Sequence, residues 1–261
     1  MLLTELCSFL REKQIAPRKS LSQNFLIDRN VADKIVRTAD IQPGDLVLEI
    51  GAGPGMLTRA LLDQGARLIA IEKDLVWAEE LPRLQTADQR LTVRCEDILE
   101  STLPAEPFKV VANLPYHITA PILIKLCEHV PQMISATMMM QLEVAERLVN
   151  FQQSSLSIFI QFFGVAALKF RVTPTCFFPQ PSVDSAIVRI DSRPPPTVAQ
   201  EPFFKLVRTA FQQKRKMLSS SLQKLYPAAV VQQALAKIGV RIDARPHMLS
   251  LNQWIELFYS L

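Results

Sequence analysis

The sequence has few cysteines and few histidines, and neither type is clustered. No Cys-x-x-Cys pair occurs, and the two residue types are spread along the chain: Cys7, Cys95, Cys127, Cys176, His117, His129 and His247. This spacing offers no ligand set for a zinc ion, so we expect core thiols and no bound metal. A Gly-x-Ser-x-Gly elbow and a Gly-x-x-x-x-Gly-Lys-Ser/Thr loop are also missing, which argues against a serine hydrolase and a P-loop enzyme.

Long hydrophobic runs are missing as well. The longest apolar stretch, Leu156 to Leu168, contains Ser157 and Gln161 and is well short of the roughly 20 residues that a membrane-spanning helix needs. Charged residues arrive too early at the amino terminus for a signal peptide, beginning with Glu5. We therefore expect a cytoplasmic protein without a membrane anchor.

What the sequence does contain is enough apolar material for a large core. It has 261 residues, of which 49% are hydrophobic and 21% charged, which allows one large domain with or without a small one. The formal net charge of +4 is unevenly distributed, because residues 193–261 carry ten Lys or Arg against three Asp or Glu. The basic charge is thus at the end of the chain, where we expect contact with a polyanion.

A strand, a glycine turn and a helix follow one another near residue 50. Asp45 to Ile50 is typical of a strand, Gly51-Ala52-Gly53-Pro54-Gly55 of a tight turn, and Met56 to Leu62 of a helix. This order is the first unit of a nucleotide-binding α/β sheet. Met56 stands where the dinucleotide fingerprint Gly-x-Gly-x-x-Gly requires its last glycine, which disfavours NAD.

Two acidic residues follow the next predicted strands. Glu72 ends the strand Arg67 to Ile71, where a carboxylate can accept both hydroxyls of a ribose. After a predicted helix from Asp74 to Leu84, Asp97 lies just past the strand Leu91 to Cys95, where it could accept from the amino group of an adenine. The alternative is that both are ordinary solvated charges.

The segment Val110-Val111-Ala112-Asn113-Leu114-Pro115-Tyr116 is typical of a buried strand that ends in a rigid loop. Asn113 would lie at the carboxyl end of a parallel strand, where such sheets bind their ligands. Its amide oxygen could accept from the exocyclic amine of a planar base, and Tyr116 offers a flat ring. The alternative is a plain Asn-x-Pro turn with the tyrosine in the core.

The remaining segments alternate helix and strand up to about residue 190. Expected helices are residues 4–15, 29–38, 120–128, 143–149 and 155–163, and expected strands are residues 134–142, 165–172 and 186–190. Asp28 is a candidate N-cap for the second of these helices. The proline-rich loop after Cys176 would leave Phe177 or Phe178 free to project a ring, unless both belong to the core.

A stiff linker of three prolines, from Ser192 to Thr197, precedes a segment in which every element is predicted to be helical. The helices are expected at Pro202 to Gln212, Arg215 to Leu225, Ala228 to Ile238 and Leu251 to Leu261. Four cations in this segment favour a phosphate-binding surface over a solvated helix end: Arg208, Lys214, Arg215 and Lys216.

Over nearly its full length the chain resembles the ribosomal RNA small-subunit (16S) adenine N6,N6-dimethyltransferase family. The motifs that carry the resemblance are Gln23-Asn24-Phe25-Leu26, Glu49 to Gly55, Ile71-Glu72, Glu96-Asp97, Asn113 to Tyr116, Phe177 to Ser185, Arg215-Lys216 and Arg245-Pro246. Two positions of the glycine turn depart from the family pattern, Ala52, where proline is usual, and Pro54. All three glycines are kept, so the departures bear on the stiffness of the turn.

The resemblance implies a Rossmann-like α/β sheet that uses S-adenosylmethionine, in residues 1–192, and a small all-helical RNA-binding domain in residues 193–261. It implies dimethylation of the N6 amines of two adjacent adenines near the 3' end of 16S ribosomal RNA during small-subunit biogenesis. The expected partner is the small ribosomal subunit, and we expect a monomer.

The resemblance also implies roles for single residues. The cofactor would contact Asn24, Leu26, Gly51, Glu72, Asp97 and Asn113, and the target adenine would meet Asn113, Leu114, Tyr116 and Phe177. His117 needs no role, because the alkylated amine can lose its proton to water.

Other assignments remain open. The related large-subunit (23S) dimethyltransferases tend to carry isoleucine where Leu114 stands, and adenine-specific DNA methyltransferases usually show Asn-Pro-Pro followed by an aromatic residue. A different class of function is a ribosome-assembly factor that binds RNA, with methylation secondary or lost.

Overall fold

The computed structural model describes residues 1–18, 21, 23–115, 118–149 and 154–261. The chain divides into two compact units, which are described separately. The first consists of Met1–Ala145 and Val165–Arg193, and the second of Glu146–Gly164 and Pro194–Leu261. The sequence-based division at residue 192 assigned Glu146–Gly164 to the domain that contains the sheet. In the structure the contacts of this segment group it with the C-terminal helices.

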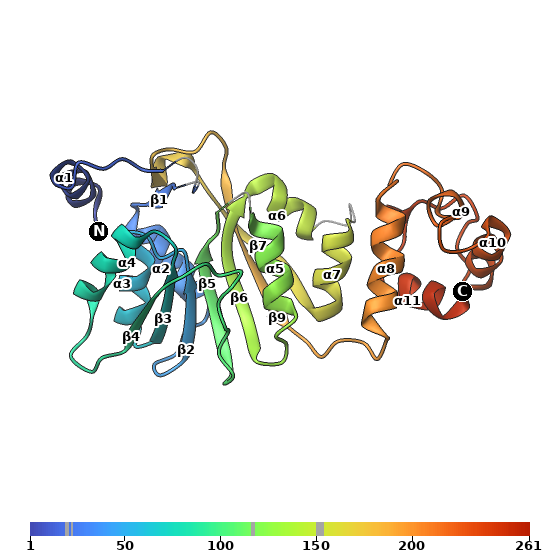
Figure 1. The fold of residues 1–261 in the computed structure, drawn as a ribbon, viewed down its shortest axis with the longest axis horizontal. Coiled ribbons are helices and arrows are strands. Elements are labelled where there is room, and N and C mark those ends of the chain that lie inside the picture. The colour runs from blue at the N-terminus through green and yellow to red at the C-terminus, as the bar shows by residue number, and fades with distance from the viewer. Residues whose placement is uncertain (19–20, 22, 116–117, 150–153) are drawn as a thin grey trace. The chain divides into compact units, whose positions relative to one another are not determined.

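The first unit is built on a seven-stranded sheet of order β4-β3-β2-β5-β6-β9-β7 (Figure 1). The strands are β2 (Leu46–Ile50), β3 (Arg67–Glu72), β4 (Leu91–Cys95), β5 (Phe108–Asn113), β6 (Met133–Gln141), β7 (Gly164–Val172) and β9 (Ser185–Ser192). The pairs from β4 through to β6 are parallel, and β9 runs antiparallel to β6. Because β3 and β5 lie on opposite sides of β2, the strand order reverses there, and this is where such sheets bind ligands.

Helices precede and connect the strands. They are α1 (Leu3–Glu12), α2 (Arg29–Thr38), α3 (Met56–Asp63), α4 (Leu75–Glu80), α5 (Thr119–Cys127) and α6 (Leu142–Val149). Asp28 caps α2 as predicted, accepting from the backbone N–H of Asn30 and Val31. The helix predicted from Asp74 to Leu84 instead tightens into a 3-10 turn at Leu81, because Pro82 has no N–H to donate.

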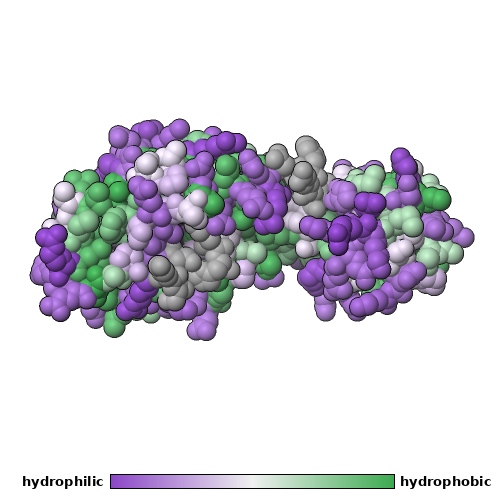
Figure 2. Space-filling view, turned by 90° about the horizontal axis from the view of Figure 1, so that it is seen from above, coloured by the Kyte–Doolittle hydropathy of each residue, from purple (hydrophilic) through white to green (hydrophobic). Residues whose placement is uncertain are grey.

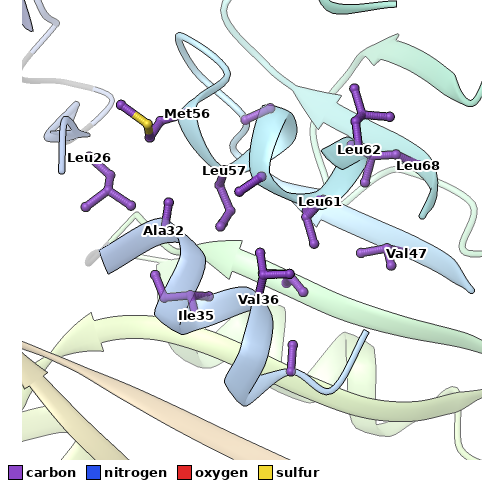
Figure 3. Close-up of a cluster of buried hydrophobic side chains, with 14 of the residues drawn as sticks. Leu26, Ala32, Ile35, Val36, Val47, Met56, Leu57, Leu61, Leu62 and Leu68 are labelled. Atoms are coloured by element: carbon purple, nitrogen blue, oxygen red, sulfur yellow. The ribbon is translucent and has the colours of Figure 1, made fainter. Parts of the chain in front are cut away.

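The main core lies between α2, α3 and the sheet (Figure 3). Every residue of β2 is buried, so apart from Glu49 the strand is apolar on both faces and its sequence does not alternate. The labelled side chains of the cluster are Leu26, Ala32, Ile35, Val36, Val47, Met56, Leu57, Leu61, Leu62 and Leu68.

A short antiparallel ribbon joins β1 (Phe25–Leu26) to β8 (Phe177–Phe178). Leu26 is paired with Phe177, and both side chains are buried in the main core. Neighbouring side chains of a strand point to opposite faces, so Phe25 and Phe178 pack instead in a second cluster with Trp77. Of the two rings that the sequence left free to project, Phe177 does not do so, because its side chain is 1% exposed.

The second unit is helical, with α7 (Ser155–Phe163), α8 (Gln200–Phe211), α9 (Leu218–Ser221), α10 (Ala228–Lys237) and α11 (Leu251–Ser260). Rings of α7 pack on rings of α8, with Phe159 and Phe162 both within 5.0 Å of Phe204 between centroids. Hydrophilic residues cover much of the face of this unit that Figure 2 shows at the right.

The helix predicted from Arg215 to Leu225 is wrong. Residues 212–216 form turns, and only Leu218–Ser221 is helical. Met217 is extended, which lets the Leu218 N–H donate to the Ala244 carbonyl oxygen over 2.8 Å while the leucine side chain is buried. The three cations Lys214, Arg215 and Lys216, called the basic turn below, are consequently exposed on a turn.

Candidate functional site

A cavity lies at the carboxyl ends of β2, β3, β4 and β5, where the sequence predicted a ligand site. It is lined by residues from all four strand ends and from the N-terminal segment. Six of the predicted site residues line it: Asn24, Gly51, Glu72, Asp97, Asn113 and Leu114. Leu26 and Phe177 do not, because both belong to the main core. Tyr116 and His117 lie outside the described residues.

The glycine turn brings backbone close to its neighbours. Gly51 has φ +71, and a Cβ there would lie 3.4 Å from the carbonyl oxygen of Asn113. Gly53 has φ +50, and a Cβ there would lie 3.2 Å from the ring of Phe25. These left-handed conformations favour glycine, so the turn needs this residue type both for its shape and for its clearance.

Glu72 is held rigidly at the end of β3. Its side chain is 8% exposed, and its two oxygens accept from the N–H groups of Gly53 and Asp74, each over 2.8 Å. Burial raises the pKa of Glu72, and the two backbone N–H groups counteract this. Because each carboxylate oxygen can accept more than one hydrogen bond, both remain able to receive a pair of ribose hydroxyls.

Asp97 has a different environment after β4. Its Oδ2 accepts from Lys73 Nζ over 2.7 Å, and its Oδ1 accepts from the Leu99 N–H over 2.9 Å. The hydrogen bond from Lys73 is the main reason why the pKa of Asp97 is lowered. Asp97 is therefore ionised at neutral pH and can accept from an amino group.

Asn113 is oriented by the N-terminal segment. Its Nδ2 donates to the carbonyl oxygen of Asn24 over 3.1 Å, which leaves Oδ1 as the acceptor that the amide can offer to a ligand. The Leu114 N–H donates to the carbonyl oxygen of Met139 over 3.0 Å, and the Leu114 side chain is buried. The group that Leu114 can offer a ligand is therefore its backbone carbonyl oxygen.

The cavity is also lined by residues to which the sequence analysis assigned no role. Gln23, Lys73 and Glu96 all line it. Lys73 and Glu96 are sequence neighbours of the predicted acids, and this adjacency was the available signal. Glu96 Oε1 is buried and has no hydrogen-bond partner among the described residues. Gln23 could not be assigned in this way, because its partner Asp74 is distant in the sequence.

The basic turn and Arg208 belong to the second unit and are not part of the cavity wall. All four side chains are exposed. In the described part of the chain no helix is long and apolar enough to cross a membrane. Within the same residues, no three His, Cys, Asp or Glu side chains are grouped so that they could hold a metal ion.

The doubly wound sheet and the cavity at its switch point define the class of Rossmann-like methyltransferases. The sequence model of the ribosomal RNA adenine dimethylase family matches residues 15–261. The chain belongs to this family.

Similar proteins cover nearly the whole chain. The Ribosomal RNA small subunit methyltransferase A of Protochlamydia amoebophila is 46% identical, over 99% of this chain and 96% of the relative. That of Chlamydia caviae is 44% identical, over 98% and 96%. Among solved structures, the 23S rRNA methyltransferase ErmE is 32% identical with TM-score 0.74, covering 91% of this chain and 99% of that one. A dimethyladenosine transferase from Plasmodium falciparum is 27% identical with TM-score 0.77, covering 88% and 94%.

The chain is therefore an rRNA adenine dimethyltransferase, and members of this family use S-adenosylmethionine. The cavity fits that cofactor. The cavity wall contains a buried acid with spare acceptor sites, Glu72, at the end of β3, and an ionised acid, Asp97, after the next strand. Gly51 also lines the cavity, and it has no side chain that could project into it.

Proposed function

We propose that this enzyme transfers methyl groups from S-adenosylmethionine to the N6 amines of two adjacent adenines near the 3' end of small-subunit ribosomal RNA. Support for the small subunit comes from full-length relatives named ribosomal RNA small subunit methyltransferase A, at 44% to 46% identity. The observation that carries the chemistry is the orientation of Asn113, whose amide oxygen is the acceptor left for an amine.

Three residues would hold the cofactor. Glu72 would accept from both ribose hydroxyls, Asp97 from the adenine amino group of the cofactor, and Asn24 would close the cavity from the N-terminal segment. The backbone of Gly51, which lines the cavity, would contact the cofactor. Leu26 is left out of this set, because it does not line the cavity. When bound, S-adenosylmethionine supplies an electrophilic methyl group.

The chain's own contribution is to prepare the amine. The lone pair of an adenine amine is delocalised into the ring, so the amine is a poor nucleophile. Accepting hydrogen bonds from its two N–H groups, at Asn113 Oδ1 and at the carbonyl oxygen of Leu114, would favour a pyramidal nitrogen with its lone pair free. Holding that nitrogen in line supplies the proximity contribution, and the proton can leave to water.

The target base must leave its stack, at a cost of a few kcal/mol. A ring that stacks on it would recover about 1 to 3 kcal/mol. Phe177 is left out of this proposal, because its ring is buried in the main core. The sequence-based expectation for Tyr116 concerns a residue outside the described part of the chain.

The second unit would supply phosphate contacts through Arg208 and the basic turn. The hydrogen bond between Leu218 and Ala244 brings Arg245, which is exposed, next to this turn. Two separate segments would then present cations together to an RNA backbone. We further propose that the enzyme acts as a monomer in the cytoplasm, on the small ribosomal subunit.

Labelled S-adenosylmethionine tests the proposal when it is offered with unmethylated small subunits, with naked RNA and with large subunits. Label on adjacent adenines of the small subunit alone supports it, and label on large subunits contradicts it. An Asn113→Ala variant should transfer nothing, whereas Gln132→Ala, an exposed residue away from the cavity, serves as the matched control.

A binding factor without activity is the competing function. Tight binding to small subunits with no label on any adenine would favour it. The intact acceptor arrangement at Asn113 argues for transfer.

A further inference from the structure

Two neighbouring residues of the N-terminal segment are tied to the ends of different strands. Gln23 Nε2 donates to Asp74 Oδ2 over 2.8 Å, just after β3. The next residue, Asn24, accepts at its carbonyl oxygen from Asn113 Nδ2, at the end of β5. Both Gln23 and Asn24 line the cavity. Residues 23 and 24 therefore connect the cofactor side of the cavity to the proposed target side.

Asp74 is a rigid support for this connection. Its side chain is buried, its N–H donates to Glu72 Oε1, and its Oδ1 accepts from the Val76 N–H as the cap of α4. At the other end, Gln23 Oε1 accepts from the Arg18 N–H over 2.7 Å. Because both ends of the Gln23 amide are used, it cannot turn over without losing both hydrogen bonds.

We propose that Gln23 and Asp74 are positioning residues for methyl transfer. Their hydrogen bond, called the 23–74 bridge, holds the Asn24 carbonyl group, and that carbonyl selects which end of the Asn113 amide faces the target amine. The inference rests on the function proposed above. Neither Gln23 nor Asp74 needs to touch the reacting atoms.

The physical basis is that the two ends of an amide have almost the same size. Packing alone does not choose between them, so the hydrogen-bond partner does. If the Asn24 carbonyl moved away, Asn113 could turn over and present an N–H group to the amine, which also carries N–H groups. Two donors would then face each other, and the pyramidal amine would lose its acceptor.

The bridge is separate from Glu72 and Asp97, the two acids proposed to bind the ribose and the adenine of the cofactor. Glu72 is held by backbone N–H groups, which a change of the Gln23 side chain leaves in place. Loss of the bridge should therefore lower kcat much more than cofactor affinity, of which only the contribution of Asn24 is at risk. A direct cofactor contact by Gln23 would instead lower the affinity.

Exchanging the two chemical groups tests the bridge. Gln23→Glu sets a carboxylate against the Asp74 carboxylate, and Asp74→Asn sets an amide N–H group against that of Gln23. We expect each single variant to lower kcat about 10- to 100-fold, as small displacements of catalytic groups do. The double variant restores one donor and one acceptor in reversed order, and we expect kcat within about 5-fold of the unaltered enzyme.

The controls separate positioning from folding. Asparagine caps helices as well as aspartate does, so Asp74→Asn keeps the cap of α4. Gln23→Leu removes the bridge without repulsion and must also lose kcat. Gln132→Glu makes the same chemical change at an exposed position. Cofactor affinity by calorimetry and thermal unfolding are measured for each variant.

The outcomes distinguish the two proposals. If the unaltered enzyme transfers no label to small subunits, the proposed function fails and the bridge with it. If it does transfer label, unchanged kcat in the single variants overturns the bridge alone. The same holds if the double variant is no better than the worse single one, or if cofactor affinity falls as much as kcat.

Discussion

Glu49 is the fourth of the five residues of β2 and has almost no access to water. Its side chain is 1% exposed, and its Oε2 has no hydrogen-bond partner among the described residues. Burial raises the pKa of Glu49 from 4.5 to about 8, with a smaller contribution from the charge of Glu72, while Thr58 acts in the opposite direction. At neutral pH this glutamate is consequently protonated in the folded enzyme.

This pKa makes the free energy of unfolding depend on pH. Above pH 4.5 the unfolded chain loses the Glu49 proton, whereas the folded chain keeps it up to about pH 8. The folded state binds more protons, so stability falls as pH rises between these values. The slope for one proton is about 1.4 kcal/mol per pH unit, so roughly 2.5 kcal/mol should be lost between pH 5.5 and 7.5.

The perturbation is Glu49→Gln, which has nearly the same shape and does not ionise. The variant should lack this slope, so its stability relative to the unaltered protein should grow by about 2.5 kcal/mol over that interval. Urea unfolding, followed by fluorescence in a Trp254→Phe background, would measure it, because Trp77 then reports on the unit that contains Glu49. Parallel pH profiles for the two proteins would refute the reasoning.

Three further outcomes follow from the contacts described. Phe177→Ala should destabilise the first unit by about 3 to 5 kcal/mol in urea unfolding, and by more than Phe178→Ala does. If Phe177→Ala instead lost methyl transfer at unchanged stability, the Phe177 ring would have to be exposed to the target base. Lys73→Ala should raise the pKa of Asp97 toward its ordinary value, so on acidification below pH 5 calorimetry should show cofactor affinity falling at a higher pH than in the unaltered enzyme. Equal profiles would separate Lys73 from Asp97. Replacing Lys214–Lys216 by alanines should reduce the salt slope of RNA binding by roughly 2 to 3, and an unchanged slope would remove the basic turn from the interface.

Most strands and helices could be predicted from the sequence, because their residues follow one period over a sufficient length. Four apolar residues and one glutamate before a glycine turn defined β2, and Asp28 before an amphipathic run defined the start of α2. The carboxyl ends of parallel strands meet at one edge, so the meeting of Glu72, Asp97 and Asn113 was predictable too.

Elements fixed only by distant partners could not be predicted. The β1 to β8 ribbon has two residues in each strand, too few for a period to show. Which of Phe177 and Phe178 faces the core depends on the register with Phe25 and Leu26, more than a hundred residues earlier in the sequence. Likewise α7 is apolar on nearly all sides, so its sequence did not indicate whether the sheet or α8 would cover it.

Within the site, too, the sequence does not predict a feature that depends on a distant partner. Sequence reasoning found Asn113, but an asparagine can donate or accept, and only the acceptor serves an amine. The choice is made by the carbonyl of Asn24, 89 residues away, and that carbonyl follows directly on Gln23. A motif therefore specifies which groups are present, whereas their orientation depends on the tertiary structure. If the 23–74 bridge has the proposed role, substitutions at Gln23 will change turnover although every residue of the Asn113 motif is intact.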